Sequence, residues 1–166
     1  VVPSLNALFA TYPQVHFACA KTIPFLKLEM DSPDEVGADR LVTALAAYKR
    51  FQRNTLIIDS GTAITFCIVS ETGVYQGGAI VPGMAIASKS LHDYTAQIPE
   101  IFVSSCHKLE GKNTKEAVEI GLYYGYIDLI NGLIHRYRQV HPNLYVVGTG
   151  TGNGLACLQP HINIDG

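Results

Sequence analysis

The stretch Leu56-Ile57-Ile58-Asp59-Ser60-Gly61-Thr62-Ala63-Ile64-Thr65 decides how this chain folds. Its short apolar run, rich in β-branched residues, predicts a buried strand. The strand ends in the carboxylate of Asp59, and the turn that follows carries Gly61 and Thr62. Glycine lets a ligand approach the backbone closely, and a threonine hydroxyl can donate a hydrogen bond. A turn of this composition favours a phosphate or a cation over an apolar ligand.

The same residues also have a purely structural interpretation, because Asp, Ser and Gly commonly terminate strands. Two further features favour a ligand. Thr65 adds a second hydroxyl, and a second strand is expected over Ala63–Ser70. The turn would then be held by a stiff hairpin.

A second charged cluster, Gly37-Ala38-Asp39-Arg40, lies upstream and opens a helix expected from about Asp39 to Gln52. Asp39 could be only the N-cap of that helix, since Asp is among the favoured capping residues. Against this, Gly37 and Ala38 leave space for a ligand, and a helix N-terminus favours anions. Two such clusters in one small domain indicate phosphoryl-transfer chemistry.

The composition indicates one globular domain. With 166 residues, 48% of them hydrophobic and only 16% charged, the chain can bury a sizeable core and disorder is not expected. A net charge of -2 provides no basic field for nucleic acid or an anionic membrane. No apolar stretch is long enough to span a bilayer. The four scattered cysteines favour free thiols in a reducing cytoplasm over a zinc site.

The rest of the pattern mixes hairpins with helices, which predicts an α/β sheet that is not purely parallel. Further strands are expected over Val15–Cys19, Thr55–Asp59, Val74–Ile80 and Leu144–Val147, and further helices over 3–11, Met84–Tyr94 and Thr114–Gln139. Gly77-Gly78 and Pro82-Gly83 would mark the exit from a strand. Because the chain opens without Met in an apolar run and ends in strand-like sequence, we expect a fragment of a longer protein.

Several weaker signals carry less weight. The glycine-rich loop Gly148–Gly154 follows a strand but matches neither common phosphate-binding motif. The six histidines show no metal-ligand spacing. The tyrosines of the long helix are expected in the core or at a subunit interface rather than against a ligand.

Several stretches together resemble the type III pantothenate kinases, a family within the acetate-kinase, sugar-kinase, Hsp70 and actin-like ATPase fold group. They are Gly37–Leu41, Asp59–Thr65, Tyr75–Gly83, and Asn113-Thr114 leading into Gly121–Gly125, and their order and separations match the family. The resemblance implies an α/β domain with a mixed sheet flanked by helices, an actin-like ATPase (ribonuclease H-like) domain that is incomplete. Residues 1–166 would form a single domain, mainly the second, C-terminal half of a two-lobed kinase.

The resemblance also implies a reaction. ATP would phosphorylate the primary hydroxyl of pantothenate to give 4'-phosphopantothenate, the first step of coenzyme A biosynthesis. A monovalent cation (K⁺ or NH₄⁺) would be the cofactor, and Mg²⁺ would arrive with ATP. The protein would be a cytoplasmic homodimer, with the tyrosine-rich helix as the leading candidate for dimer packing and with no nucleic acid or membrane partner.

The family's functional positions map onto the quoted motifs. By resemblance, Gly37, Ala38, Asp39 and Arg40 line the pantothenate site, with Asp39 as the proton acceptor. Asp59 would bind the monovalent cation. The remaining implied contacts are those of Gly61 and Thr62 with ATP and that of Thr114 with pantothenate.

This chain departs from the family pattern at particular positions. The family tends to place a tyrosine where Met30 stands and an acid where Cys67 stands. Its N-terminal phosphate-binding segment is absent here, so these 166 residues alone are expected to be inactive or nearly so.

Two other functions stay open at this point. One is a non-catalytic relative that acts as a transcription accessory factor, although the presence of both Asp39 and Asp59 favours a kinase. The other is a different small-molecule enzyme of the same fold group, such as a sugar kinase or a phosphatase-like hydrolase.

Overall fold

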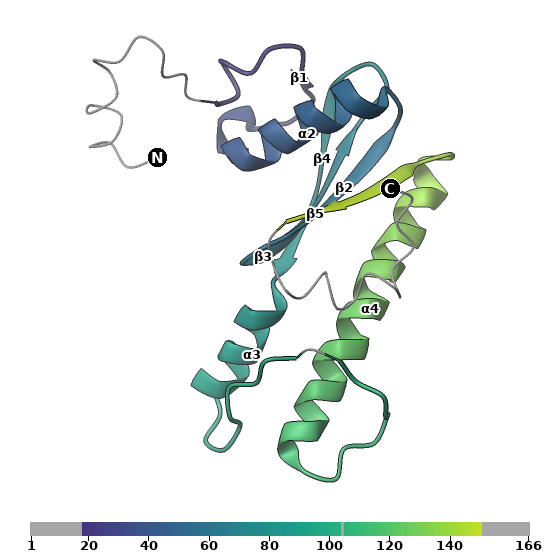
Figure 1. The fold of residues 1–166 in the computed structure, drawn as a ribbon. Coiled ribbons are helices and arrows are strands. Elements are labelled where there is room, and N and C mark those ends of the chain that lie inside the picture. Colours follow the sequence, from purple (N-terminus) through teal and green to yellow (C-terminus); the bar gives the residue numbers. More distant parts are fainter. Residues whose placement is uncertain (1–17, 104, 151–166) are drawn as a thin grey trace, which may run out of the picture.

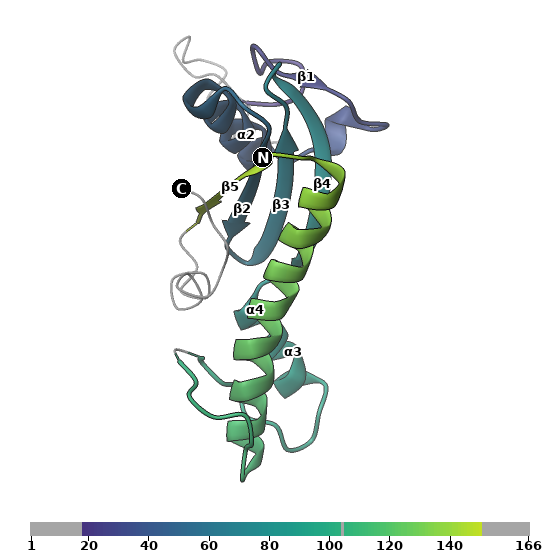
Figure 2. The same ribbon diagram turned by 90° about the vertical axis from the view of Figure 1, so that its right-hand side faces the viewer.

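The computed structural model describes residues 18–103 and 105–150, which form a five-stranded mixed sheet with helices on both faces (Figure 1, Figure 2). The strand order is β1-β4-β3-β2-β5, and β2, β3 and β4 are antiparallel neighbours. The outer pairs β1–β4 and β2–β5 are parallel. The strands are β1 Lys27–Leu28, β2 Thr55–Ser60, β3 Ala63–Val69, β4 Val74–Pro82 and β5 Tyr145–Thr149. The predicted α/β class with a mixed sheet is confirmed.

The helices begin and end within one or two residues of the predicted bounds. These helices are α2 Ala38–Phe51, α3 Met84–Asp93 and α4 Thr114–Val140. The short 3₁₀ helix η1 Pro33–Glu35 was not predicted. The expected helix 3–11 lies outside the described residues, and so does most of the expected strand Val15–Cys19. Ala18 and Cys19, the described end of that segment, are not in a strand.

Two apolar layers hold the helices against the sheet, because successive strand residues point to opposite faces. Leu56 and Ile58 of β2 lie in the layer that also contains the buried side chains of α4. Ile57 of β2 lies in the layer formed with Leu41 and Ala44 of α2. The alternation therefore places Asp59 on the α2 face of the sheet.

A β-bulge changes this alternation in β4. Cys67 of β3 pairs with Gly78, but Val69 pairs with Tyr75, so β4 carries an extra residue at this point. Gly77 has a φ of 85°, a left-handed conformation that favours glycine. The predicted exit at Pro82-Gly83 is confirmed, since β4 ends at Pro82, but Gly77-Gly78 lie inside the strand and do not mark its end. The bulge keeps Tyr75 on the α2 face.

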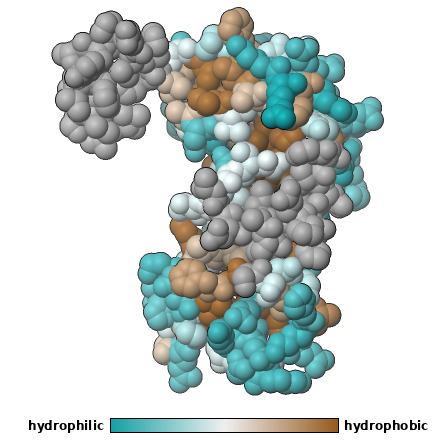
Figure 3. Space-filling model, in the orientation of Figure 1, coloured by the Kyte–Doolittle hydropathy of each residue, from teal (hydrophilic) through white to brown (hydrophobic). Residues whose placement is uncertain are grey.

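The surface carries apolar side chains at both ends of the molecule, as the brown areas of Figure 3 show. At the α3–α4 end the most exposed are Tyr94, Phe102 and Leu109, at 89%, 82% and 75%. Among the described helices, none combines the length and apolarity that a membrane crossing requires.

Candidate functional site

The position of α2 over β2 builds the site. A connection of three residues, 52–54, joins the two elements, so the helix must run back over the strand. Gln52 ends α2 in a left-handed conformation and its N–H donates to the carbonyl of Tyr48. The first turn of α2 therefore lies over the C-terminal end of β2, which brings Asp39 of the helix toward Asp59 of the strand.

The electrostatics of Asp59 reflect this approach. Partial burial raises the pKa of the Asp59 carboxyl above its usual value, and the negative charge of Asp39 raises it further. Among the described residues, no ion pair to Lys, Arg or His neutralises either carboxylate. The structure thus brings the two predicted acids together as a pair of like charges.

Asp39 does not cap the helix. The N-cap is Gly37, no side chain caps the first turn, and Ala38 is the first helical residue. A Cβ atom built on Gly37 would lie 2.5 Å from Oδ1 of Asp39, so a glycine at this position leaves the space that the carboxylate occupies. The capping interpretation of Asp39 was wrong, and its exposed carboxylate is free to meet a ligand.

Hydroxyl groups flank Asp59 on the neighbouring strands. Thr65 of β3 and Thr149 of β5 are its direct register partners, so these three side chains form a row on one face. A Cβ atom on Gly150, which has a φ of 110°, would lie 2.7 Å from Oδ1 of Asp59. Sequence reasoning did not single out Thr149, whose only signal was the weak glycine-rich loop around it.

The turn between β2 and β3 is fixed by its backbone. The N–H of Gly61 donates to the carbonyl of Ala63 at 2.9 Å, and the N–H of Gly83 donates to the carbonyl of Thr62 at 2.8 Å. A Cβ atom on Gly83 would lie 2.5 Å from the carbonyl oxygens of Gly61 and Thr62. The side chain of Thr62 is exposed beside this close contact, and a Cβ atom on the exposed Gly61 would meet the carbonyl oxygen of Ala63 at an ordinary contact distance of 3.8 Å.

Arg40 follows Asp39 and crosses to the sheet. Its Nε–H donates to Sγ of Cys67 at 3.3 Å, and the hydroxyl of Tyr75 donates to the same sulfur at 3.4 Å. Burial opposes the charge of Arg40, but its hydrogen bond to Cys67 and the proximity of Cys67 and Tyr75 raise its pKa. Burial also raises the pKa of Tyr75. Sequence reasoning missed both partners, because the bulge that aligns them depends on strand register.

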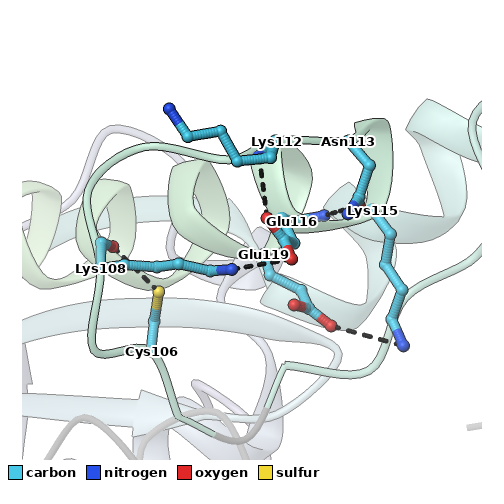
Figure 4. Close-up of polar contacts among 7 residues, drawn as sticks. All are labelled: Cys106, Lys108, Lys112, Asn113, Lys115, Glu116 and Glu119. Atoms are coloured by element: carbon cyan, nitrogen blue, oxygen red, sulfur yellow. Dashed lines mark hydrogen bonds and ion pairs between the residues drawn. The ribbon is translucent and has the colours of Figure 1, made fainter.

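Thr114 lies elsewhere. It is the first residue of α4, and that end of the helix is remote from α2 in both ribbon views (Figure 1, Figure 2). Around it, Asn113 caps the helix by accepting the N–H of Glu116, whose carboxylate contacts Lys108 and the N–H of Lys112 (Figure 4). Within one chain, the structure does not bring Thr114 together with residues 37–40.

The donor set around Asp59 consists of oxygen atoms. Within the described ranges, no group of three or more His, Cys, Asp or Glu side chains could hold a metal ion. A carboxylate, two threonine hydroxyls and backbone carbonyls suit a hard cation that shares its coordination with a substrate. The arrangement fits K⁺, NH₄⁺ or Mg²⁺ better than a transition metal.

Comparisons with known proteins point to one family. The family model for type III pantothenate kinase matches residues 1–136. The type III pantothenate kinase of Syntrophotalea carbinolica is 42% identical over 129 residues, which are 77% of this chain and 49% of that protein. That of Listeria monocytogenes serotype 4a is 38% identical over 132 residues, 79% of this chain and 50% of the relative. The chain spans about half the length of the curated relatives it matches.

A solved structure is also similar in outline. It is a protein from Campylobacter jejuni described as a Baf family transcriptional activator. The match has a TM-score of 0.49 and 21% sequence identity, and covers 83% of this chain and 68% of the other.

Proposed function

Since the chain belongs to the type III pantothenate kinase family, we propose that the full-length protein transfers a phosphoryl group from ATP to the primary hydroxyl of pantothenate. The product would be 4'-phosphopantothenate, the starting point for coenzyme A synthesis in the cytoplasm. The observation that carries the proposal is the approach of Asp39 and Asp59 on one face of the sheet. Members of this family are transferases, and two acids that form no ion pair with another described residue suit that chemistry.

Asp39 is the proposed proton acceptor. The transition state of phosphoryl transfer is loose, so the attacking hydroxyl needs orientation more than activation. An exposed carboxylate at the helix N-terminus can accept a hydrogen bond from that hydroxyl and take its proton late in the reaction. Gly37 leaves room for this carboxylate, so the reacting group can lie beside the start of the helix.

Asp59 is the proposed ligand of the monovalent cation, with Thr65 and Thr149 beside it. A bound cation supplies positive charge to the phosphates of ATP. Its charge would also offset the repulsion between Asp59 and Asp39. Gly61 and Thr62 would present the backbone and a hydroxyl to ATP, because their turn is exposed and held by Gly83.

Arg40 is the proposed partner of the pantothenate carboxylate. Its half-buried guanidinium has no ion pair with a carboxylate of the described residues. Arginine binds carboxylates through two parallel N–H groups, which suits the free end of this substrate. Asp39, the preceding residue, would contact the primary hydroxyl. The first turn of α2 would then bind both the hydroxyl end and the carboxylate end of pantothenate.

We further propose that the protein is a homodimer in which Thr114 of one subunit completes the pantothenate site of the other. Two observations support this. Thr114 lies at the end of α4 remote from α2 (Figure 1), and the exposed apolar side chains Tyr94, Phe102 and Leu109 belong to the same α3–α4 end. Tyr123 and Tyr126 of α4 are buried in the chain's own core, so the exposed residues rather than these tyrosines would form the interface.

A complementation experiment tests the shared site. Asp39→Asn and Thr114→Val should each inactivate the full-length dimer. After co-refolding in equal amounts, one of the two sites in each mixed dimer has both native residues, so about a quarter of wild-type activity should return. If Thr114 acted within its own chain, every site in the mixture would keep one defect and no activity would return.

The reaction itself is tested by coupled ADP release from the full-length protein. Pantothenate-dependent ADP release that increases with K⁺ or NH₄⁺ supports the kinase. ADP release with hexoses but not with pantothenate would indicate another kinase of the fold group. Binding of ATP without turnover of either substrate would favour the transcription-accessory function.

A further inference from the structure

We propose that Cys67 and Tyr75 are positioning residues for Arg40, holding its guanidinium so that the terminal nitrogens face the substrate carboxylate. This inference rests on the proposed function and concerns how the pantothenate site obtains its specificity. The three residues come from α2, β3 and β4, so the arrangement depends on the tertiary fold rather than on local sequence.

The contacts converge on one sulfur atom. Nε of Arg40 lies 3.3 Å from Sγ of Cys67, and the hydroxyl oxygen of Tyr75 lies 3.4 Å from it. Both groups act as donors, so the sulfur accepts two hydrogen bonds. Cζ of Arg40 lies 5.8 Å from the centroid of the Tyr75 ring, within the range of a cation–π contact. The guanidinium is therefore restrained at Nε by the sulfur of Cys67 and contacted by the ring of Tyr75.

Burial makes this restraint rigid. Cys67 is 2% exposed and Tyr75 is 0% exposed, and both belong to the apolar layer beneath α2. Side chains in such a layer occupy fixed rotamers. The bulge at Gly77 keeps Tyr75 on the same face as Cys67. Arg40 is thus anchored to a part of the core that cannot rotate away when a ligand binds.

The chemistry of the anchor explains why a thiol suits this position. A guanidinium has five N–H donors, and the bond from Nε leaves four on the two terminal nitrogens. These four form the fork that binds a carboxylate through two parallel hydrogen bonds. A carboxylate, which the family tends to place at this position, would pair with the charge of Arg40, whereas the thiol of Cys67 orients the guanidinium and leaves that charge for the substrate.

The test compares Cys67→Ala with Cys67→Ser in the full-length enzyme. Alanine removes the acceptor, so KM for pantothenate should rise about tenfold while kcat and the KM for ATP stay within about twofold of wild type. Serine restores an acceptor and should return KM to within about threefold of wild type. Tyr75→Phe keeps the ring but loses one donor, and should give an intermediate KM.

Cys106→Ala is the matched control, because this half-buried thiol donates to the carbonyl of Lys108, has no hydrogen bond to Arg40, and should leave KM unchanged. An unchanged KM in Cys67→Ala would overturn the proposal. So would equal losses of kcat and thermal stability in Cys67→Ala and Cys67→Ser, since these would indicate packing alone.

A second measurement does not depend on activity. The Nε–H of Arg40 should give a slowly exchanging proton resonance in wild-type protein, and Cys67→Ala should lose that protection. If wild-type protein released no ADP with pantothenate, the proposed function would fail, yet this resonance would still show whether Cys67 holds Arg40. Equal exchange in wild type and Cys67→Ala would overturn the positioning role.

Discussion

Asp39 on the first turn of α2 faces Asp59 at the end of β2, and the charge of Asp39 raises the pKa of the Asp59 carboxyl. The two residues are far apart in sequence and meet because the helix returns over the strand. Like charges placed together without a counter-ion destabilise a fold, so such a pair is retained where a cation or substrate uses it.

Replacing Asp59 should therefore stabilise the fold and weaken the binding of the cation. The folded-state pKa of Asp59 lies above the usual value of 3.8, so ionisation penalises the folded state as pH rises through that pKa. At pH 7 and low salt, Asp59→Asn should raise the free energy of unfolding by about 0.5 kcal/mol, because this partly exposed pair is screened by solvent. Below the usual pKa the difference should vanish.

Thermal unfolding with and without K⁺ measures this effect. Wild-type protein should gain stability as K⁺ is added, since a ligand that binds only the folded state stabilises it, and Asp59→Asn should not. Asp128→Asn, an exposed substitution on α4, is the control and should behave as wild type. A potassium response that survives in Asp59→Asn would contradict the cation assignment.

Gly37→Ala should impair activity more than stability. The backbone at Gly37, with φ -56° and ψ 141°, accepts alanine, but the new Cβ would lie 2.5 Å from Oδ1 of Asp39 and displace it. We expect turnover to fall about tenfold or more while the free energy of unfolding falls by about 1 kcal/mol or less.

Gly132→Ala is the matched control for that substitution. A Cβ atom there meets nothing within 4 Å, so alanine should stabilise α4 by about 0.5–1 kcal/mol and leave turnover unchanged. Steady-state rates and thermal melts of both variants in the full-length protein separate the two effects. Wild-type turnover in Gly37→Ala would show that the position of the Asp39 carboxylate is unimportant.

Glu116 should make the start of α4 sensitive to acid. The side chain of Lys108 and the N–H of Lys112 lower the pKa of Glu116 from 4.5 to about 2 (Figure 4). A lowered folded-state pKa contributes stability above pH 4.5 that is lost as pH falls toward about 2. The stability difference between wild type and Glu116→Gln should shrink across this window.

Melting temperatures measured at intervals from pH 6 to pH 2 check this loss. Glu110→Gln is the control, because the ion pair of Glu110 with Lys112, at 3.3 Å, joins two exposed side chains. A stability difference for Glu116→Gln that stays constant with pH would mean that its carboxylate does not hold the loop before α4.

Much of the fold could be predicted because strands β2, β3 and β4 and helix α4 have strong apolar patterns with clear turn residues between them. Asp39 and Asp59 could be identified because each follows a recognisable local signal. Local sequence does not reveal strand register, so the row of Thr65, Asp59 and Thr149 could not be foreseen. For the same reason, Gly77 was placed at a strand end although it forms a bulge inside β4.

The position of Thr114 was beyond prediction for a different reason. A sequence motif indicates the role that a residue has in the family. It does not indicate how far that residue lies from the other motifs in the folded chain. The 27-residue helix α4 begins far from α2 and reaches β5 only at its other end (Figure 1). Only the fold shows that Thr114 and Asp39 cannot serve one site within one chain.

The most direct test of the central claim is the pantothenate-dependent turnover of full-length Asp39→Asn, with its fold checked by circular dichroism. If Asp39 takes the proton of the attacking hydroxyl beside Asp59, kcat should fall about 100-fold or more while the spectrum and melting profile stay native. Turnover equal to that of wild type would contradict the account, because the carboxylate would then have no part in the reaction.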